Sequence, residues 1–287
     1  MSSYLSQIIQ LALLEDAVYE DHTAHATLPE QQWGHAFIKA KADGVLSGCT
    51  LAQQVFQTLD DSIQQQWLKH DGDLVTSGET IVQLTGNTRK LLAAERTALN
   101  FLQHLSGIAT ATHAFVRETE GTACSIADTR KTTPGLRILE KQAVEHGGGI
   151  NHRMDLASGM LIKENHIEAC GSISEAIRLC SEHNDDIWIE VECENEDEVR
   201  EAVLSCPDII LLDNMTPEQV RHCRSLVPES ILLEASGNIT LSNARDYAQT
   251  GVDRIAIGAI THSAPALDLS MLMQAAPKQH AANDDPA

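Results

Sequence analysis

The sequence is poor in aromatic residues, in positive charge and in long apolar runs. Phe, Trp and Tyr make up 3% of its 287 residues, and 20 Lys and Arg stand against 41 Asp and Glu, a formal charge of −21. Nucleic acids and anionic membranes are bound by clustered Lys and Arg, so this balance argues against both partners. No stretch approaches the roughly 18 apolar residues that a membrane-spanning helix requires. We therefore expect a protein that binds neither nucleic acid nor membranes.

Cysteine is present, but without the spacing of a metal site or a disulfide framework. The seven cysteines are odd in number and scattered, with no C-x-x-C pair or Cys/His cluster of zinc-ligand spacing. Such thiols are typical of the reducing cytosol. The N-terminal segment lacks the basic region of a signal peptide and soon turns acidic. These features predict a cytoplasmic protein with reduced cysteines.

The first part of the chain predicts a mixed α/β domain. An amphipathic helix over residues 3–15 precedes short strand patterns between 36 and 86, with a helix over 51–59 among them. A long helical pattern runs from Leu91 towards Glu118, and Gly107 is a point at which it could kink or divide. We predict an N-terminal α/β sandwich domain over residues 1–110, to which residues 266–280 could add.

Beyond Gly121 the pattern becomes a β-α repeat. Strands that alternate with helices form a parallel sheet. The short aliphatic segments that predict strands lie at 124–128, 159–163, 187–192, 209–213, 231–236 and 254–258. Six strands, with room for one more, fall short of a regular eight-stranded barrel. We therefore predict a smaller or incomplete α/β barrel over residues 111–265, followed by a disordered acidic tail at 278–287.

Polar residues end these predicted strands, where an aliphatic core would not place them. They are Asp128, Lys163, Glu190 and Glu192, Asp213, and Glu234 and Ser236. In a barrel of parallel strands these ends converge on one face, which is where such folds carry their active sites.

A basic window interrupts the acidic sequence between Arg130 and Lys163. It holds six of the 20 Lys and Arg but only three acids, so it carries +3 while the rest of the chain carries −24. A positive cleft in a negative protein indicates a small polyanionic ligand. Arg130, Lys131, Arg153 and Lys163 lie in loops or at strand ends, and we expect them to contact this ligand. Arg137 and Lys141 lie one helical turn apart, and that spacing favours an ordinary charged helix face.

Glu192 and Asp213 close two successive strands. Paired carboxylates in such a place can chelate magnesium, act as acid and base, or stabilise a developing cation. They can also merely cap the helices that follow. Opposite a basic cluster, they suggest a site that handles an anion and a positive charge together.

Glycines follow the last two strands, at Ser236-Gly237-Asn238 and Gly258-Ala259-Ile260. A glycine between a strand and a helix lets backbone N–H groups approach a phosphate, although such a glycine is often only a turn. Gly147-Gly148-Gly149 precedes Asn151-His152-Arg153 and could be a flexible loop or a close backbone approach.

These residues, in this order, closely resemble the quinolinate phosphoribosyltransferases, also called carboxylating nicotinate-nucleotide pyrophosphorylases. The matching stretches span nearly the whole chain, and Glu20, where the family pattern has glycine, is one departure. They are LLEDAVYEDHT, AERTALNFLQHLSGIAT, IADTRKTTPGLRILEKQAVEHGGGINHRMDLASGMLIKENHI, IEVE, ILLDNM, LEASGNI and GVDRIAIGAITHSAPALDLSM. The resemblance implies an α/β sandwich beside an open barrel of about seven strands. It also implies transfer of phosphoribosyl from phosphoribosyl pyrophosphate (PRPP) to quinolinate with decarboxylation, giving nicotinate mononucleotide for NAD biosynthesis.

The resemblance also implies the roles of site residues. Those that bind the quinolinate carboxylates are Arg130, Lys131, His152, Arg153 and Lys163, with Thr129 beside them. Arg96 would come from the neighbouring subunit of a homodimer. Glu192 and Asp213 face the ribose and the Mg²⁺-pyrophosphate, and together with Lys131 and Lys163 they form the catalytic set. The residues near the 5′-phosphate are Ser236, Gly237, Asn238, Gly258, Ala259 and His262.

Three other functions remain open at this point. A sister enzyme on the same fold would couple PRPP to another aromatic acid such as nicotinate, although two carboxylates justify five or six cations better than one does. An aldolase could form a Schiff base on Lys163, which ends a barrel strand. A non-catalytic anion-binding protein has no use for Glu192 and Asp213 in its pocket.

Overall fold

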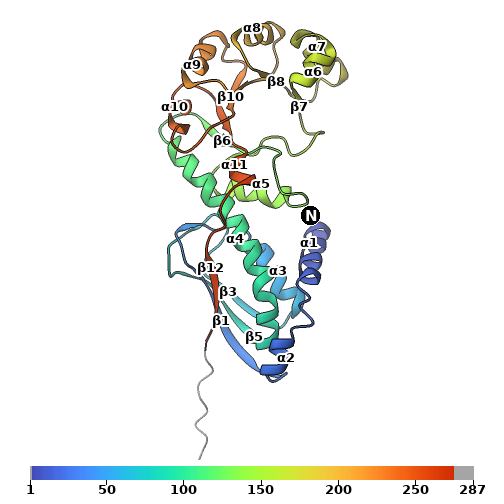
Figure 1. Cartoon of the computed structure of the whole chain (residues 1–287), viewed down its shortest axis with the longest axis vertical. Helices are drawn as coiled ribbons and strands as arrows, with labels where there is room; N and C mark the ends of the chain where they lie inside the picture. The colour runs from blue at the N-terminus through green and yellow to red at the C-terminus, as the bar shows by residue number, and fades with distance from the viewer. Residues whose placement is uncertain (1, 275–287) are drawn as a thin grey trace, which may run out of the picture. The chain divides into compact units, whose positions relative to one another are not determined.

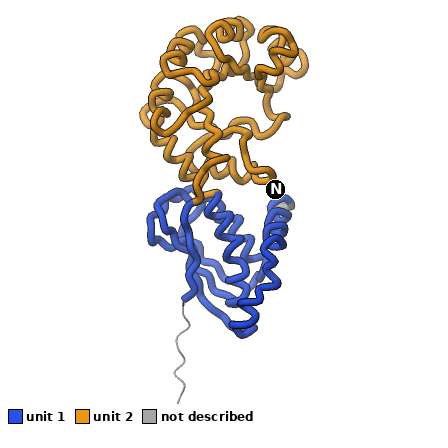
Figure 2. The backbone as a smooth tube through the Cα atoms, viewed as in Figure 1, with its two compact units in different colours: residues 1–104, 267–287 blue, residues 105–266 orange. Residues whose placement is uncertain are grey.

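A computed structural model describes residues 2–274, and the predicted disordered tail at 278–287 lies outside the described residues. The chain divides into two compact units, residues 1–104 with 267–287 and residues 105–266 (Figure 2). The two units meet along the sequence within helix α4 (Thr88–Glu118), where the sequence prediction places the change at residue 110. None of the helices in the described part of the chain is long and apolar enough to span a bilayer.

The first unit is built on an antiparallel sheet with the strand order β12-β1-β5-β3. Its other strands, β2 and β4, form a separate pair. Every second residue of β1 is buried, at Ala36, Ile38 and Ala40, so one face of the strand packs into the core. The elements are α1 (Ser2–Glu15), α2 (His22–Thr27), β1 (Trp33–Ala40), β2 (Gly44–Val45), α3 (Cys49–Leu59), β3 (Gln64–Trp67), β4 (Leu74–Val75), β5 (Thr80–Asn87) and β12 (Leu269–Gln274).

The second unit is a parallel sheet with the strand order β6-β11-β10-β9-β8-β7. Helices α6 to α10 surround the strands (Figure 1), and the strands are accordingly buried on both faces. The strands are β6 (Ser125–Ala127), β7 (Met160–Ile162), β8 (Ile189–Cys193), β9 (Ile209–Asp213), β10 (Leu232–Ser236) and β11 (Arg254–Ala256). The helices are α5 (Arg137–His146), α6 (Glu164–Cys170), α7 (Ile173–His183), α8 (Glu196–Ser205), α9 (Pro217–Leu226), α10 (Ala244–Ala248) and α11 (Ala259–His262).

These strands confirm the predicted incomplete α/β barrel. All six predicted segments contain a strand, and β6 and β7 are the two edges of the sheet. Ile150 forms a single parallel bridge to Ala127 of β6. The seventh strand that the family pattern implies is reduced, in the described residues, to this one bridge.

Two groups of glycines permit close packing of backbone segments. Helix α4 continues unbroken through Gly107, where a Cβ atom would lie 2.2 Å from the carbonyl oxygen of Pro265. Cβ atoms on Gly147 and Gly149 would meet Thr112 of α4 at under 3 Å. Gly107 therefore does not divide the helix, and Gly147-Gly148-Gly149 is a close backbone approach.

Candidate active site

A cavity of about 410 Å³ opens at the C-terminal ends of the parallel strands. All of its lining residues belong to the second unit. They are Thr129, Arg130, Lys131, His152, Arg153, Leu161, Lys163, Glu192, Leu211, Asp213, Glu234, Ser236 and Ala256. This is the end of the sheet at which α/β barrels carry their active sites.

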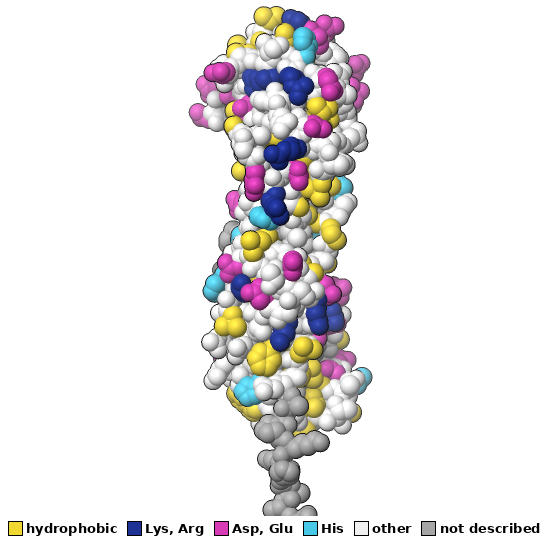
Figure 3. Space-filling model, turned by 90° about the vertical axis from the view of Figure 1, so that its left-hand side faces the viewer, with side chains coloured by type: hydrophobic (Ala, Val, Ile, Leu, Met, Phe, Trp, Pro, Cys, Tyr) yellow, Lys and Arg dark blue, Asp and Glu magenta, His cyan; other side chains and the backbone are white. Residues whose placement is uncertain are grey.

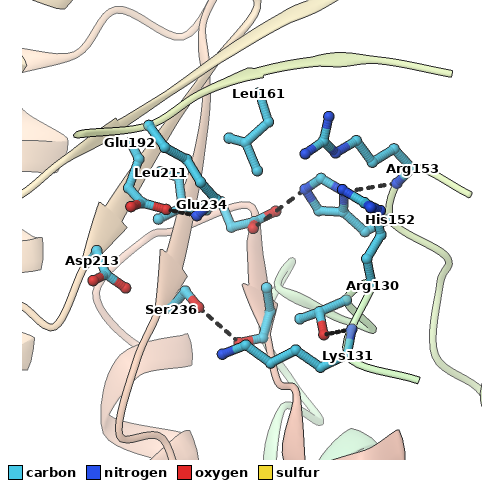
Figure 4. A pocket seen from close by; sticks show the side chains of 13 residues that line it. Arg130, Lys131, His152, Arg153, Leu161, Glu192, Leu211, Asp213, Glu234 and Ser236 are labelled. Atoms are coloured by element: carbon cyan, nitrogen blue, oxygen red, sulfur yellow. Dashed lines mark hydrogen bonds and ion pairs between the residues drawn. The ribbon is translucent and has the colours of Figure 1, made fainter. Parts of the chain in front are cut away.

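The cavity has a cationic side and an acidic side. Arg130 and Lys131 follow β6, and His152 and Arg153 follow the bridge at Ile150. Figure 4 shows Arg130, His152 and Arg153 facing the cavity from one side, with the carboxylates of β8 and β9 on the other. On the surface seen in Figure 3, by contrast, basic side chains are interspersed with acidic and uncharged ones. Four basic side chains, Arg130, Lys131, Arg153 and Lys163, thus line one cavity.

On the cationic side, two positively charged guanidinium groups lie near each other. Partial burial and the nearby Arg130 lower the pKa of the Arg153 guanidinium, while Glu190 opposes this effect. Arg153 donates through Nη1 to the carbonyl oxygen of Gly159 at 3.0 Å. An anionic ligand would relieve the repulsion between the two guanidinium groups, so this side of the cavity favours carboxylate or phosphate groups.

The acidic side consists of Glu192 at the end of β8 and Asp213 at the end of β9. Lys163 forms an ion pair with Glu192, and Asn214 Nδ2 donates to Asp213 Oδ2 at 2.6 Å. Partial burial and the nearby Glu192 raise the pKa of Asp213, whereas Lys163 and Lys131 counteract the rise. Two crowded carboxylates favour a cation or a centre of developing positive charge between them and the ligand.

Neither carboxylate serves as a helix cap. Asn195 caps α8 by accepting the N–H of Glu198, and Thr216 caps α9 by accepting the N–H of Gln219. The interpretation of Glu192 and Asp213 as helix caps is therefore wrong. Both side chains are left to face the cavity.

His152 makes polar contacts through both ring nitrogens. Its Nδ1 accepts the backbone N–H of Arg153 at 2.7 Å. Nε2 is 2.8 Å from Glu190 Oε2 and 3.7 Å from Glu234 Oε1. The imidazole is thus held between the cavity and a buried pair of carboxylates.

A buried charged layer forms the floor of the cavity, where Glu234 is one of the lining residues. Glu190 and Glu234 are fully buried; Arg254 donates to Glu234, and its Nη2 lies 3.6 Å from Glu190 Oε1. Burial and the nearby Glu190 raise the pKa of Glu234 to about 7, and Arg254 and His152 oppose the rise. His152, Glu190 and Glu234 have the mutual spacing of metal ligands, within 4.8 Å, but Arg254 already supplies a cation to both carboxylates.

Sequence reasoning named Glu190 and Glu234 among the polar residues that end the strands but gave them no role, and it missed Arg254. Glu190 and Glu234 stand two residues before Glu192 and Ser236, so they share the inner face of β8 and β10 one step deeper. Arg254 stands directly beside Glu234 in the register of β10 and β11. The alternation of strand residues carried the signal for the two acids, while the pairing with Arg254 depends on the register.

The charged helix face predicted for Arg137 and Lys141 is wrong for Lys141. That side chain is fully buried and forms an ion pair with the equally buried Asp128. Arg137 is partly buried and donates through Nε to Thr132 Oγ1 at 3.0 Å. The one-turn spacing identified a helix correctly, but it does not reveal that this face packs inward.

The loops after β9 and β10 are joined through Asn214. Asn238 Nδ2 donates to Asn214 Oδ1 at 2.9 Å, and a Cβ on Gly237 would lie 2.2 Å from the same oxygen. Gly237 also has φ +90°, so only glycine fits there without strain. Ser236 reaches the cavity, whereas Gly237 and Asn238 lie beside its lining.

The turn after β11 approaches the cationic side. A Cβ on Gly258 would lie 3.0 Å from Lys131 Cδ and 3.3 Å from the His262 ring. Gly258, Ala259 and His262 are not part of the lining, but Thr261 Oγ1 donates to the carbonyl oxygen of Lys131 at 2.7 Å. Arg96, an exposed residue of α4, belongs to the first unit and does not line the cavity of its own chain.

Comparisons with known proteins identify the family of this chain. Residues 21–106 and 108–272 match the family models described as the N-terminal and C-terminal domains of quinolinate phosphoribosyl transferase. A probable carboxylating nicotinate-nucleotide pyrophosphorylase of Bacillus subtilis (strain 168) is 44% identical over 270 residues, covering 93% of this chain and 92% of its own. That of Mycobacterium leprae is 39% identical over 269 residues, covering 92% and 95%. The solved nicotinate-nucleotide pyrophosphorylase of Francisella tularensis superposes with a TM-score of 0.92 at 38% identity, covering 96% of this chain and 97% of its own. The chain belongs to the quinolinate phosphoribosyltransferase family.

Proposed function

We propose that this chain transfers the phosphoribosyl group of PRPP to quinolinate, releasing carbon dioxide and pyrophosphate and forming nicotinate mononucleotide. The observation that carries the proposal is the division of one cavity into a cationic and an acidic side. A dianionic acceptor suits the first side, and a ribose that develops positive charge suits the second.

The cationic side is the proposed site of the two quinolinate carboxylates. Arginine and lysine bind carboxylates through charge-assisted hydrogen bonds, which are stronger than neutral ones. Thr129 supports this side, because its Oγ1 accepts the backbone N–H of Lys131 at 3.1 Å. The residues we assign to quinolinate are Thr129, Arg130, Lys131, His152, Arg153 and Lys163.

The acidic side is the proposed site of the ribose and of Mg²⁺. Glu192 and Asp213 offer carboxylate oxygens, the donors that Mg²⁺ prefers, and Mg²⁺ is usually held by one or two carboxylates together with substrate phosphates. Partial burial and the nearby Glu192 raise the pKa of Asp213, and a cation bound there would oppose both effects. When bound there, Mg²⁺ neutralises charge on the pyrophosphate leaving group.

The turns after β10 and β11 are the proposed site of the 5′-phosphate. Ser236 reaches the cavity, and the glycines leave backbone N–H groups accessible. The residues we assign to this group are Ser236, Gly237, Asn238, Gly258, Ala259 and His262.

The chemistry then follows from position and charge. As the bond from ribose to pyrophosphate breaks, the carboxylates of Glu192 and Asp213 stabilise the oxocarbenium character of the ribose. Binding on the cationic side holds the quinolinate nitrogen against the anomeric carbon, which supplies proximity. The alkylated ring nitrogen is positive and stabilises the electron pair that remains on C2 when the 2-carboxylate departs as carbon dioxide. The carbanion at C2 then takes up a proton. A substrate analogue that couples but keeps its 2-carboxylate would count against this last step.

The decisive assay compares quinolinate with nicotinate in the presence of PRPP and Mg²⁺. We expect mononucleotide and carbon dioxide from quinolinate alone, because two carboxylates match the four cations and His152 better than one. Mononucleotide formed from nicotinate instead would move the function to a sister enzyme. Borohydride trapping of a carbonyl substrate on Lys163 would indicate a Schiff base, but an exposed lysine ion-paired with Glu192 is a poor candidate for one.

We further propose a homodimer in which Arg96 completes the cavity of the partner subunit. Its support is the exposure of Arg96 on α4, in the unit that does not line the cavity. Arg96→Ala and Lys163→Ala should each be inactive alone. Mixed and allowed to exchange subunits at equal amounts, they should regain about a quarter of wild-type activity, because half the dimers then carry one intact site. Failure to regain activity despite subunit exchange would contradict donation across the interface.

A further inference from the structure

A buried ion pair outside the cavity holds the backbone of His152, whose imidazole lines the cavity. Asp128 follows β6 and Lys141 lies in α5, and both side chains are 0% exposed. Asp128 Oδ1, which accepts a hydrogen bond from Lys141, also accepts the backbone N–H of His152 at 2.8 Å. Lys141 Nζ also donates to the carbonyl oxygen of His152 at 2.9 Å. One ion pair thus holds both polar backbone groups of His152.

This contact matters because nothing regular holds the neighbouring backbone. Ile150 pairs with β6 through a single bridge, and residues 151–159 form no helix or strand. His152 and Arg153, which both line the cavity, lie in this segment. The backbone position of His152 also fixes the Arg153 N–H that His152 Nδ1 accepts. Displacement of His152 would therefore move two ligand-binding side chains at once.

Stability alone does not explain the ion pair. Burial raises the pKa of Asp128 and lowers that of Lys141, so removal from water opposes both charges, although their mutual contact favours them. An apolar pair of similar volume is often as stable as a buried ion pair, or more so. An apolar pair cannot, however, hold the N–H and the carbonyl of His152.

We propose that Asp128 and Lys141 are positioning residues, which fix His152 and Arg153 for binding the aromatic dicarboxylate. This role rests on the proposed function, because it assumes that the cationic side receives quinolinate. Neither residue touches the ligand. Both act through the backbone of His152.

The test separates folding from positioning with an apolar replacement of the pair. Lys141→Met alone leaves the Asp128 charge buried and should lower the midpoint of thermal unfolding. Adding Asp128→Leu should return the midpoint to near the wild-type value. The double variant should nevertheless lose about 100-fold in kcat/KM for quinolinate, mainly through KM, with KM for PRPP changed less than about 2-fold.

A matched control exists on the same sheet, away from the cavity. Asp253 Oδ2 accepts from Arg224 at 3.1 Å and from the backbone N–H of Leu233 at 2.7 Å, so it repeats the arrangement of an ion pair that also holds a backbone group. The double variant Arg224→Met with Asp253→Leu should leave both KM values unchanged. A rise in KM for quinolinate in this control equal to that in the test variant would overturn the proposal.

Phthalate binding decides the remaining outcomes. Calorimetric binding of phthalate, an aromatic 1,2-dicarboxylate, requires no turnover. If wild-type protein fails to convert quinolinate, the proposed function fails, but weaker phthalate binding by the double variant still supports positioning. Equal phthalate binding or an unchanged KM for quinolinate in the folded double variant overturns it. If the double variant does not fold, Asp128→Ala replaces it, since alanine removes the acceptor of the His152 N–H; unchanged phthalate binding then overturns the proposal.

Discussion

The mouth of the parallel sheet, at the C-terminal ends of its strands, and the layer of side chains just beneath it are built from the same strands but have different roles. On β8, Glu192 lines the mouth and Glu190 lies in the layer below; on β10, Ser236 lines the mouth and Glu234 lies one step deeper, at the floor of the cavity. The ion pair at the mouth is accessible, with Lys163 46% exposed, whereas Glu190 and Glu234 are 0% exposed. Side chains two positions apart on one strand therefore differ in role. Those at the mouth are accessible to a ligand, and the deeper ones hold neighbouring side chains in place. The comparison predicts that changes at the mouth affect activity and changes below it affect stability.

The largest expected effect is on the buried layer. Arg254→Leu leaves Glu190 and Glu234 buried without their fixed cation, and it should lower the free energy of unfolding by about 3–5 kcal/mol at pH 8. Adding Glu234→Gln should recover much of this loss, because it removes one of the two facing charges. Denaturant unfolding of the single and double variants measures both. A single variant as stable as wild type would show that Arg254 does not compensate these acids.

The next effect is on activity at the mouth. Lys163→Met should lower kcat/KM by about 10²–10³-fold, as loss of one charged donor at a reacting centre does, with little change in stability. Lys69→Met is the matched control, because Lys69 pairs with Glu79 at 3.0 Å on the surface of the first unit. Steady-state kinetics should show normal activity in the control. Equal losses in both variants would remove the distinction between the two pairs.

The pH dependence of stability should reveal the buried acid. The unfolded Glu234 carboxyl ionises near 4.5 and the folded one at about 7. Between these values the folded state binds more protons, so stability falls as the pH rises, by at most about 3 kcal/mol. Glu234→Gln should flatten the curve between pH 4.5 and 7. Parallel curves for wild type and variant would contradict the raised pKa.

The smallest effect is expected at an exposed ion pair that does not line the cavity. Arg200 and Glu196 form an exposed pair one helical turn apart on α8, and such pairs often contribute nothing measurable. Glu196→Gln should leave both the unfolding midpoint and kcat/KM within experimental error. A clear change in either would mean that surface charge influences the site more than the cavity geometry implies.

Much of the fold was predictable because its signals are local. The six parallel strands are aliphatic runs at a regular β-α spacing, and the helix over 51–59 matches α3 (Cys49–Leu59) closely. The lining residues Arg130, Lys131, Arg153 and Lys163 were predictable from charge, because basic residues in an acidic chain indicate a ligand.

The features that the sequence did not predict depend on contacts between residues that are distant in sequence. Lys141 has the spacing of a surface residue, and only its contact with Asp128, 13 residues away, shows that it is buried. Arg254 reaches Glu234 only because β10 and β11 pair in that register. Neither register nor the inward face of a helix is encoded in the spacing of one segment, so these partners emerged only from the structure.

A crystal structure of the protein with quinolinate bound would test the central claim most directly. The account predicts that quinolinate occupies the cavity at the mouth of the parallel sheet, with both carboxylates on Arg130, Arg153 and their neighbours and the ring nitrogen towards Glu192 and Asp213. Quinolinate bound elsewhere, or bound in the cavity with its carboxylates away from these arginines, would contradict it.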